Sequence, residues 1–80
     1  TDVASLEMPI GAKPLSVQMQ GEIACIWAMV DPNAEKEKRK FGIIGTGHAF
    51  PDGMMDGIDW TYLGTFQPTN RLVFHVFYQN

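Results

Sequence analysis

The stretch RLVFHVFY, residues 71–78, decides the fold because its side chains alternate with a period of two. In an extended chain, one face of this stretch carries Leu72, Phe74, Val76 and Tyr78. The opposite face carries His75 between Val73 and Phe77. This pattern predicts a β-strand, and the turn-forming residues Pro68-Thr69-Asn70 predict a bend from a preceding strand.

Working outward, proline and glycine interrupt the chain at short intervals, and the segments between them have the character of strands. The expected strands are residues 3–8, 15–20, 23–30, 38–44, 60–67 and 71–78. Residues 23–30 are apolar on both faces, which predicts a strand in the centre of a sheet or beneath a second layer. Residues 34–40 have helical propensity but no apolar face, so at most one solvated turn of helix is expected there.

About six strands with short sequential connections predict an all-β fold. We expect an antiparallel meander that forms a small barrel or a two-layer sandwich, as one β domain over residues 1–80. In residues 60–67, strict alternation places Trp60, Tyr62 and Gly64 on one face and Thr61, Leu63 and Thr65 on the other.

Composition narrows the classes of function. A chain of 80 residues is near the lower limit for an unaided core, and Cys25 is its single cysteine, so oligomerisation is the remaining support. The aromatic C-terminal strand makes a homo-oligomer plausible. The net charge of −3 argues against general nucleic-acid binding. No apolar run reaches the ~18 residues of a membrane span and no signal peptide is visible, so we expect a cytoplasmic protein without membrane association.

The run KEKRKFGIIGTGHAF, residues 36–50, holds the strongest candidate for a binding site. Gly45 and Gly47 would let backbone N–H groups approach an anion, and Thr46 and His48 would hydrogen-bond it. The competing interpretation is a turn or β-bulge that needs positive φ at its glycines. No helix is expected after this motif, which excludes a P-loop or a dinucleotide-binding turn.

Two further features extend this candidate site. Arg39 or Lys40 would neutralise a phosphate, although the same cations would also suit a solvated strand edge. Lys38 and Lys40 share a face and Arg39 points the other way, so only one of these sets belongs to a given pocket. Trp60 or Tyr62 would stack on a base.

Other chemistry finds little support in the sequence. The two histidines, His48 and His75, lack clustered Asp, Glu or Cys, so neither a metal site nor a cofactor is expected. Pairing of Cys25 with a histidine, or of Thr46 with His48, has no spacing that supports catalysis, and a nucleotide hydrolase is a minor alternative. His75 is expected to be a hydrogen-bonded core or interface residue. In the loop, Asp52, Asp56 and Asp59 have the character of solvated carboxylates, and Met54-Met55 of a lid or protein contact.

Several segments together resemble a family of small tailed-phage and prophage proteins that is described only as a domain of unknown function. They are MPIGAKPLSVQMQ (8–20), IWAMVDP (26–32), KEKRKF, GTGH, YLGTFQ (62–67) and LVFHVF (72–77). The resemblance implies a phage-encoded accessory protein that acts in the infected cell. It also implies a further strand upstream of Thr1 and a loop over residues 51–59 longer than is usual in the family.

The leading hypothesis is therefore a phage-encoded, non-enzymatic binding protein, an anti-defence sponge that sequesters a host nucleotide immune signal of cyclic-nucleotide or ADP-ribose type. This class assignment is an analogy. The expected ligand-binding residues are Arg39, Lys40, Gly45, Thr46, Gly47, His48, Trp60 and Tyr62. The alternative is a protein-interaction module, either a virion or assembly component or an inhibitor of a host protein.

Overall fold

The computed structural model describes residues 2–47 and 59–80, and this part of the chain is built from strands without a helix. The strands are β1 (Asp2–Pro9), β2 (Lys13–Gln20), β3 (Ile23–Met29), β4 (Lys36–Gly45), β5 (Trp60–Thr69) and β6 (Leu72–Gln79). The predicted all-β class is confirmed.

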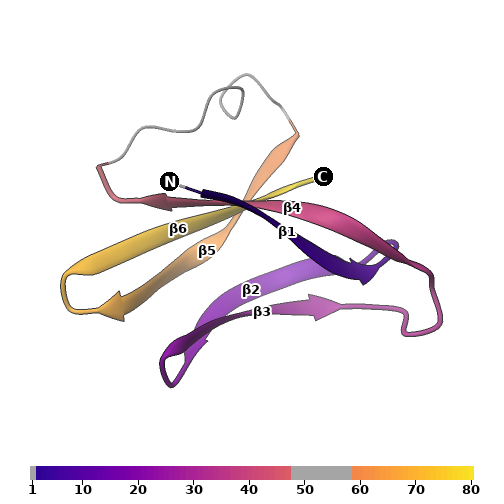
Figure 1. The fold of residues 1–80 in the computed structure, drawn as a ribbon, viewed down its shortest axis with the longest axis horizontal. Coiled ribbons are helices and arrows are strands. Elements are labelled where there is room, and N and C mark those ends of the chain that lie inside the picture. Colours follow the sequence, from indigo (N-terminus) through magenta and orange to yellow (C-terminus); the bar gives the residue numbers. More distant parts are fainter. Residues whose placement is uncertain (1, 48–58) are drawn as a thin grey trace.

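The strands form two antiparallel sheets that do not close into a barrel (Figure 1). Four strands lie in the order β1-β4-β6-β5, and β2 and β3 form a two-stranded hairpin. The β2–β3 hairpin lies between β1 and β4 in the chain, so β1 pairs with a strand that returns from the second layer. The architecture is therefore a small two-layer sandwich.

The core lies where β2 packs against the four-stranded sheet. Val17 of β2, Phe41 of β4 and Val76 of β6 are buried together. The space between Val17 and β5 is so narrow that a Cβ on Gly64 would lie 3.0 Å from Val17 Cγ1. We call the side of the four-stranded sheet that packs on β2 the inner face, and the opposite side the outer face.

The alternation predicted for β6 is confirmed. On the inner face, the Phe74 ring stacks on Phe66 with centroids 5.5 Å apart, and the Tyr78 ring lies 6.5 Å from that of Phe41. His75 points the other way, toward Thr46. One side of β6 therefore builds the core and the other builds the outer face.

The central or covered position expected for residues 23–30 is wrong. β3 pairs with β2 alone, and its side chains Ile23, Trp27 and Met29 are 68%, 46% and 64% exposed. In the hairpin it is β2 that makes the main contact with β5, which leaves β3 at the margin of the layer. An apolar pattern on both faces therefore does not reflect burial on both faces here.

The single helical turn considered for residues 34–40 does not form. Asp31 instead closes a tight turn, accepting at its Oδ1 from Asn33 N (3.0 Å) and at its carbonyl from Ala34 N (3.1 Å). β4 then starts at Lys36, which pairs with Pro9 of β1. Pairing with β1 outweighs the local helical propensity.

The strict alternation expected in residues 60–67 is also wrong, because the register of β5 against β6 shifts between Tyr62 and Gly64. A bulge inserts one extra residue, and both Leu63 and Gly64 then contribute to the inner face. Thr65 is thereby moved to the outer face, beside Tyr62.

The expected lid residues Met54-Met55 and the carboxylates Asp52 and Asp56 lie outside the described residues. Within residues 2–47 and 59–80, no helix has the length and apolarity that a membrane crossing requires.

Candidate functional site

A continuous chain of side-chain hydrogen bonds crosses the outer face. His75 Nε2 lies 2.8 Å from Thr46 Oγ1, and His75 Nδ1 lies 2.8 Å from Thr65 Oγ1. Thr65 Oγ1 is in turn bonded to the Tyr62 hydroxyl. We call these four residues, Tyr62, Thr65, His75 and Thr46, the His75 network.

Three strands bring the network together. Thr46 follows the last residue of β4 and extends the ladder, since its N–H donates to Val73 O (3.0 Å). Gly47 then turns the chain with a φ of +85°, a conformation that glycine adopts without strain. His75 pairs in register with Ile44 on one side and Thr65 on the other. The turn therefore requires Gly47, and Thr46 lies directly before it, at the end of β4 and within reach of His75.

The network is accessible along most of its length. Thr46, Thr65 and Tyr62 are exposed, and His75 is half-buried between them. Tyr62 is 54% exposed as a residue, and its ring meets Phe77 edge-on with centroids 5.4 Å apart. These groups can hydrogen-bond a ligand lying over the sheet, and the Tyr62 ring can stack on a planar group.

A pocket of about 320 Å³ adjoins the Thr46 end of the network. Its lining consists of Gly45, Thr46, Arg71, Leu72, Val73 and Phe74. Arg71 supplies a cation beside the Gly-Thr-Gly turn, the role that the sequence had assigned to Arg39 or Lys40. The signal that points to Arg71 is the antiparallel pairing of β4 with β6, because this register brings the start of β6 to the end of β4.

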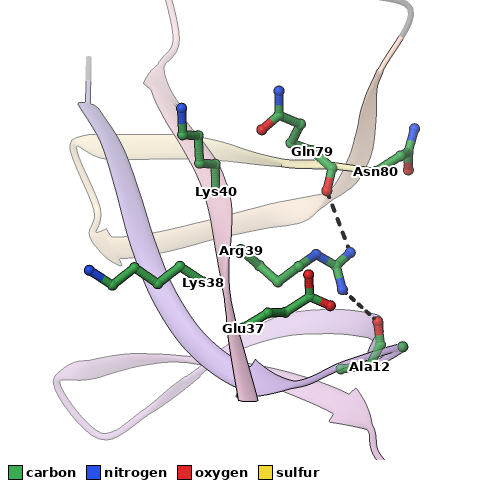
Figure 2. Close-up of a pocket in the computed structure, with 8 residues that line it drawn as sticks. Ala12, Glu37, Lys38, Arg39, Lys40, Gln79 and Asn80 are labelled. Atoms are coloured by element: carbon green, nitrogen blue, oxygen red, sulfur yellow. Dashed lines mark hydrogen bonds between the residues drawn. The ribbon is translucent and has the colours of Figure 1, made fainter. Parts of the chain in front are cut away.

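Arg39 has a different environment, shown in Figure 2. Its Nη1 donates to Ala12 O (2.9 Å) and its Nη2 to Gln79 O (3.4 Å), at the wall of a polar hollow of about 430 Å³. The guanidinium therefore joins β4 to the β1–β2 turn and to the end of β6. Lys38 points away from it in the same view, as strand alternation predicts.

The predicted site residues thus fall into separate groups. Thr46 and Tyr62 belong to the His75 network, whereas Gly45 lines the adjoining pocket and Gly47 directly follows Thr46. Lys40 alternates onto the same face but lies six residues from Thr46, or ~20 Å along the strand.

Trp60 is half-buried at the start of β5, opposite Gln79, and so lies nearer the Arg39 hollow than the Thr46 pocket. His48 lies outside the described residues.

The structure brings no cluster of metal ligands to the network in the part of the chain that it describes. Within residues 2–47 and 59–80, no three His, Cys, Asp or Glu side chains gather at one place. Cys25 belongs to the other sheet, where its Sγ contacts Ile23 O (3.8 Å) and Gln20 Oε1 (4.0 Å). The imidazole bonded to Thr46 is that of His75, which the sequence analysis had not paired with it.

The family described as "Domain of unknown function (DUF7352)" matches residues 1–80. The chain belongs to this family. No curated protein and no solved structure matches the chain. Membership of the DUF7352 family confirms the expected relationship to a domain of unknown function, and the chemistry of the site rests on the residues themselves.

Proposed function

We propose that the protein is a non-enzymatic binding protein for a small anionic, nucleotide-like ligand, which it holds where β4 ends, in the pocket beside Arg71 and along the adjoining outer face. The observation that carries the proposal is the position of Thr46. This residue is both a wall of the Arg71 pocket and one end of the His75 network. A cationic pocket therefore continues directly into a row of accessible hydrogen-bonding groups.

In this proposal the two ends of the ligand bind to different kinds of side chain. The anionic group enters the pocket, where the Arg71 guanidinium can contact two of its oxygens at once. The remainder lies over Thr65 and Tyr62, and a planar base stacks on the exposed Tyr62 ring. A pocket of about 320 Å³ is at the small end of ligand sites, which suits a phosphate with part of its attached sugar.

The biological role within this proposal is sequestration. A phage-encoded sponge for a cyclic-nucleotide or ADP-ribose type of immune signal would act in the cytoplasm of the infected cell and would need no catalysis. The phage origin and the sponge role rest on the resemblance and the analogy described above. The geometry of the outer face supports the ligand chemistry.

A second candidate function is a protein-interaction module, and the exposed row Ile23, Trp27 and Met29 on β3 favours it. Large apolar side chains that gather on one strand are typical of a surface that meets another protein. The partner in this candidate is a host or phage protein, or a second copy of the chain.

Arg71→Gln tests the ligand proposal in a thermal-shift assay against cyclic dinucleotides and ADP-ribose. A ligand at 100-fold above its Kd adds ~2.7 kcal/mol to the free energy of unfolding, so a binder raises the melting temperature clearly. We expect the native protein to respond to at least one nucleotide, and Arg71→Gln to lose most of that response. Lys13→Gln, which removes an exposed cation from β2, is the matched control and should respond like the native protein.

Absence of a response to every nucleotide, combined with capture of a defined host or phage protein, contradicts the ligand proposal. Mass spectrometry of the ligand after heat release separates binding from cleavage. Intact ligand is the expected result. Product whose formation is abolished by His75→Ala would make the protein a hydrolase instead.

A further inference from the structure

The hydrogen-bond direction of the His75 network can be assigned from its Thr46 end. The Thr46 hydroxyl donates to Val73 O at 3.4 Å, so toward the imidazole it acts as an acceptor. A neutral imidazole has one N–H donor and one acceptor nitrogen. With this assignment, Nε2 is the donor to Thr46, and Nδ1 accepts from Thr65.

The same reasoning applies to the Tyr62 end of the network. The single hydroxyl proton of Thr65 is used on Nδ1, so Thr65 Oγ1 accepts from the Tyr62 hydroxyl. All four hydrogen bonds then run in one direction, from Tyr62 to Val73 O. With neutral His75, Tyr62 uses its proton inward and offers lone pairs to whatever lies over the face.

Protonation of His75 reverses the two hydrogen bonds that join His75 Nδ1 to Thr65 and Thr65 to Tyr62. Both ring nitrogens of an imidazolium are donors, so Nδ1–H now donates to Thr65 Oγ1. The Thr65 proton must then go to the Tyr62 oxygen, and the Tyr62 O–H turns outward. One proton taken up at His75 thereby changes Tyr62 from an acceptor into a donor.

We propose that His75 sets the hydrogen-bonding polarity that Tyr62 presents on the outer face, and so selects between two classes of ligand. The neutral network suits an anion that also carries an N–H donor, such as the exocyclic amine of a nucleotide base. The protonated network suits a simple oxyanion. The ligand classes rest on the proposed function, whereas the polarity change concerns the protein alone.

Among the described residues of β4, β5 and β6, no carboxylate shares the outer face with His75. On the outer face, the charged or titratable groups are Lys36, Lys38 and Lys40 of β4, Tyr62 of β5, and Arg71 directly before β6. None of the outer-face residues of β4, β5 and β6 that the structure describes is Asp or Glu. Once His75 is protonated, its two N–H groups therefore donate to the hydroxyl oxygens of Thr46 and Thr65.

The chain allows a direct test because it contains only two histidines and two tyrosines. His48→Gln with Tyr78→Phe leaves His75 and Tyr62 as the sole reporters, and Phe keeps the ring that Tyr78 places near Phe41. NMR follows the imidazole resonances while the pH is lowered from about 8 to about 5. The Raman doublet of tyrosine reports whether its hydroxyl donates or accepts.

We expect the Tyr62 doublet to change in step with the protonation of His75. It should change from that of a hydroxyl that donates to Thr65 to that of a hydroxyl that accepts from Thr65. Thr65→Val removes the connecting hydroxyl, so the doublet should stay constant when the imidazole resonances show that His75 is protonated. Thr65→Ser should restore the coupling. A doublet that stays constant in the reporter protein, or that still follows pH in Thr65→Val, would overturn the inference.

Sulfate provides the ligand readout because its charge does not change over this pH range. Its affinity should rise as His75 is protonated, by about threefold more in the reporter protein than in Thr65→Val, the size expected for one hydrogen bond. An equal rise in both proteins contradicts the role of Tyr62. A switching doublet without binding of sulfate or any nucleotide would overturn the proposed function and leave the polarity switch intact.

Discussion

At the scale of single residues, Gly64 limits how closely the two layers approach. It lies on the inner face of β5, where the buried Val17 of β2 occupies the space that a side chain would need. The sequence contains this glycine within an otherwise ordinary strand pattern. Only the packing of β2 on β5 explains why a larger residue does not fit.

Gly64→Ala should therefore lower the free energy of unfolding by about 1–3 kcal/mol, the usual effect of overpacking a core. The added Cβ would lie 3.0 Å from Val17 Cγ1, so the buried Val17 side chain must shift. Denaturant unfolding of Gly64→Ala, Val17→Ala and the double variant measures the coupling. Strictly additive effects of the two substitutions would contradict this account.

At the scale of elements, Arg39 ties β4 to two other segments. Its two hydrogen bonds reach Ala12 in the β1–β2 turn and Gln79 at the end of β6, which lie far from it in sequence. A lysine has one ammonium group and cannot reproduce this forked contact. Arg39 is thus a structural residue, even though its sequence context suggested phosphate binding.

Arg39→Lys should destabilise the fold by about 1–3 kcal/mol, since hydrogen bonds made by a charged group are lost. The effect should be local, with faster amide hydrogen exchange at the end of β6 and in the β1–β2 turn. Lys38→Gln is the control, because Lys38 is exposed on the opposite side of β4 and should change stability by no more than about 0.5 kcal/mol. Equal effects of the two substitutions would count against a structural role of the Arg39 hydrogen bonds.

At the scale of the whole molecule, the exposed apolar row on β3 predicts self-association. A two-stranded hairpin is marginal alone, and here one of its faces packs on β5 while Ile23, Trp27 and Met29 remain exposed. A homo-oligomer built through this row would bury the apolar surface of both copies.

Light scattering of the native protein should accordingly give a mass above that of the 8.9 kDa chain. Trp27→Glu places a charge in the row and should reduce the mass to that of a monomer. Leu72→Ser is the matched control, because Leu72 is similarly exposed (49%) but lies on β6, and its mass should not change. A native monomer, or an oligomer unaffected by Trp27→Glu, contradicts self-association through β3.

The amino-acid sequence by itself determined the six strands and most of their faces, because period-two alternation and turn residues are local properties of the chain. Alternation in β6 correctly separated the core side, with Val76, from the side with His75. It failed in β5, where a bulge that depends on the partner strand moved Thr65 beside Tyr62.

Only the tertiary structure decided which functional groups meet. His75 contacts Thr46 and Thr65 across sequence separations of 29 and 10 residues, and Arg71 reaches the Gly-Thr-Gly turn through the register of β4 against β6. Arg39 and Thr46 are near in sequence, yet the extended strand between them holds them roughly 20 Å apart. Strand pairing is a non-local choice, and this is why the sequence identified the turn but not the cation or the imidazole beside it.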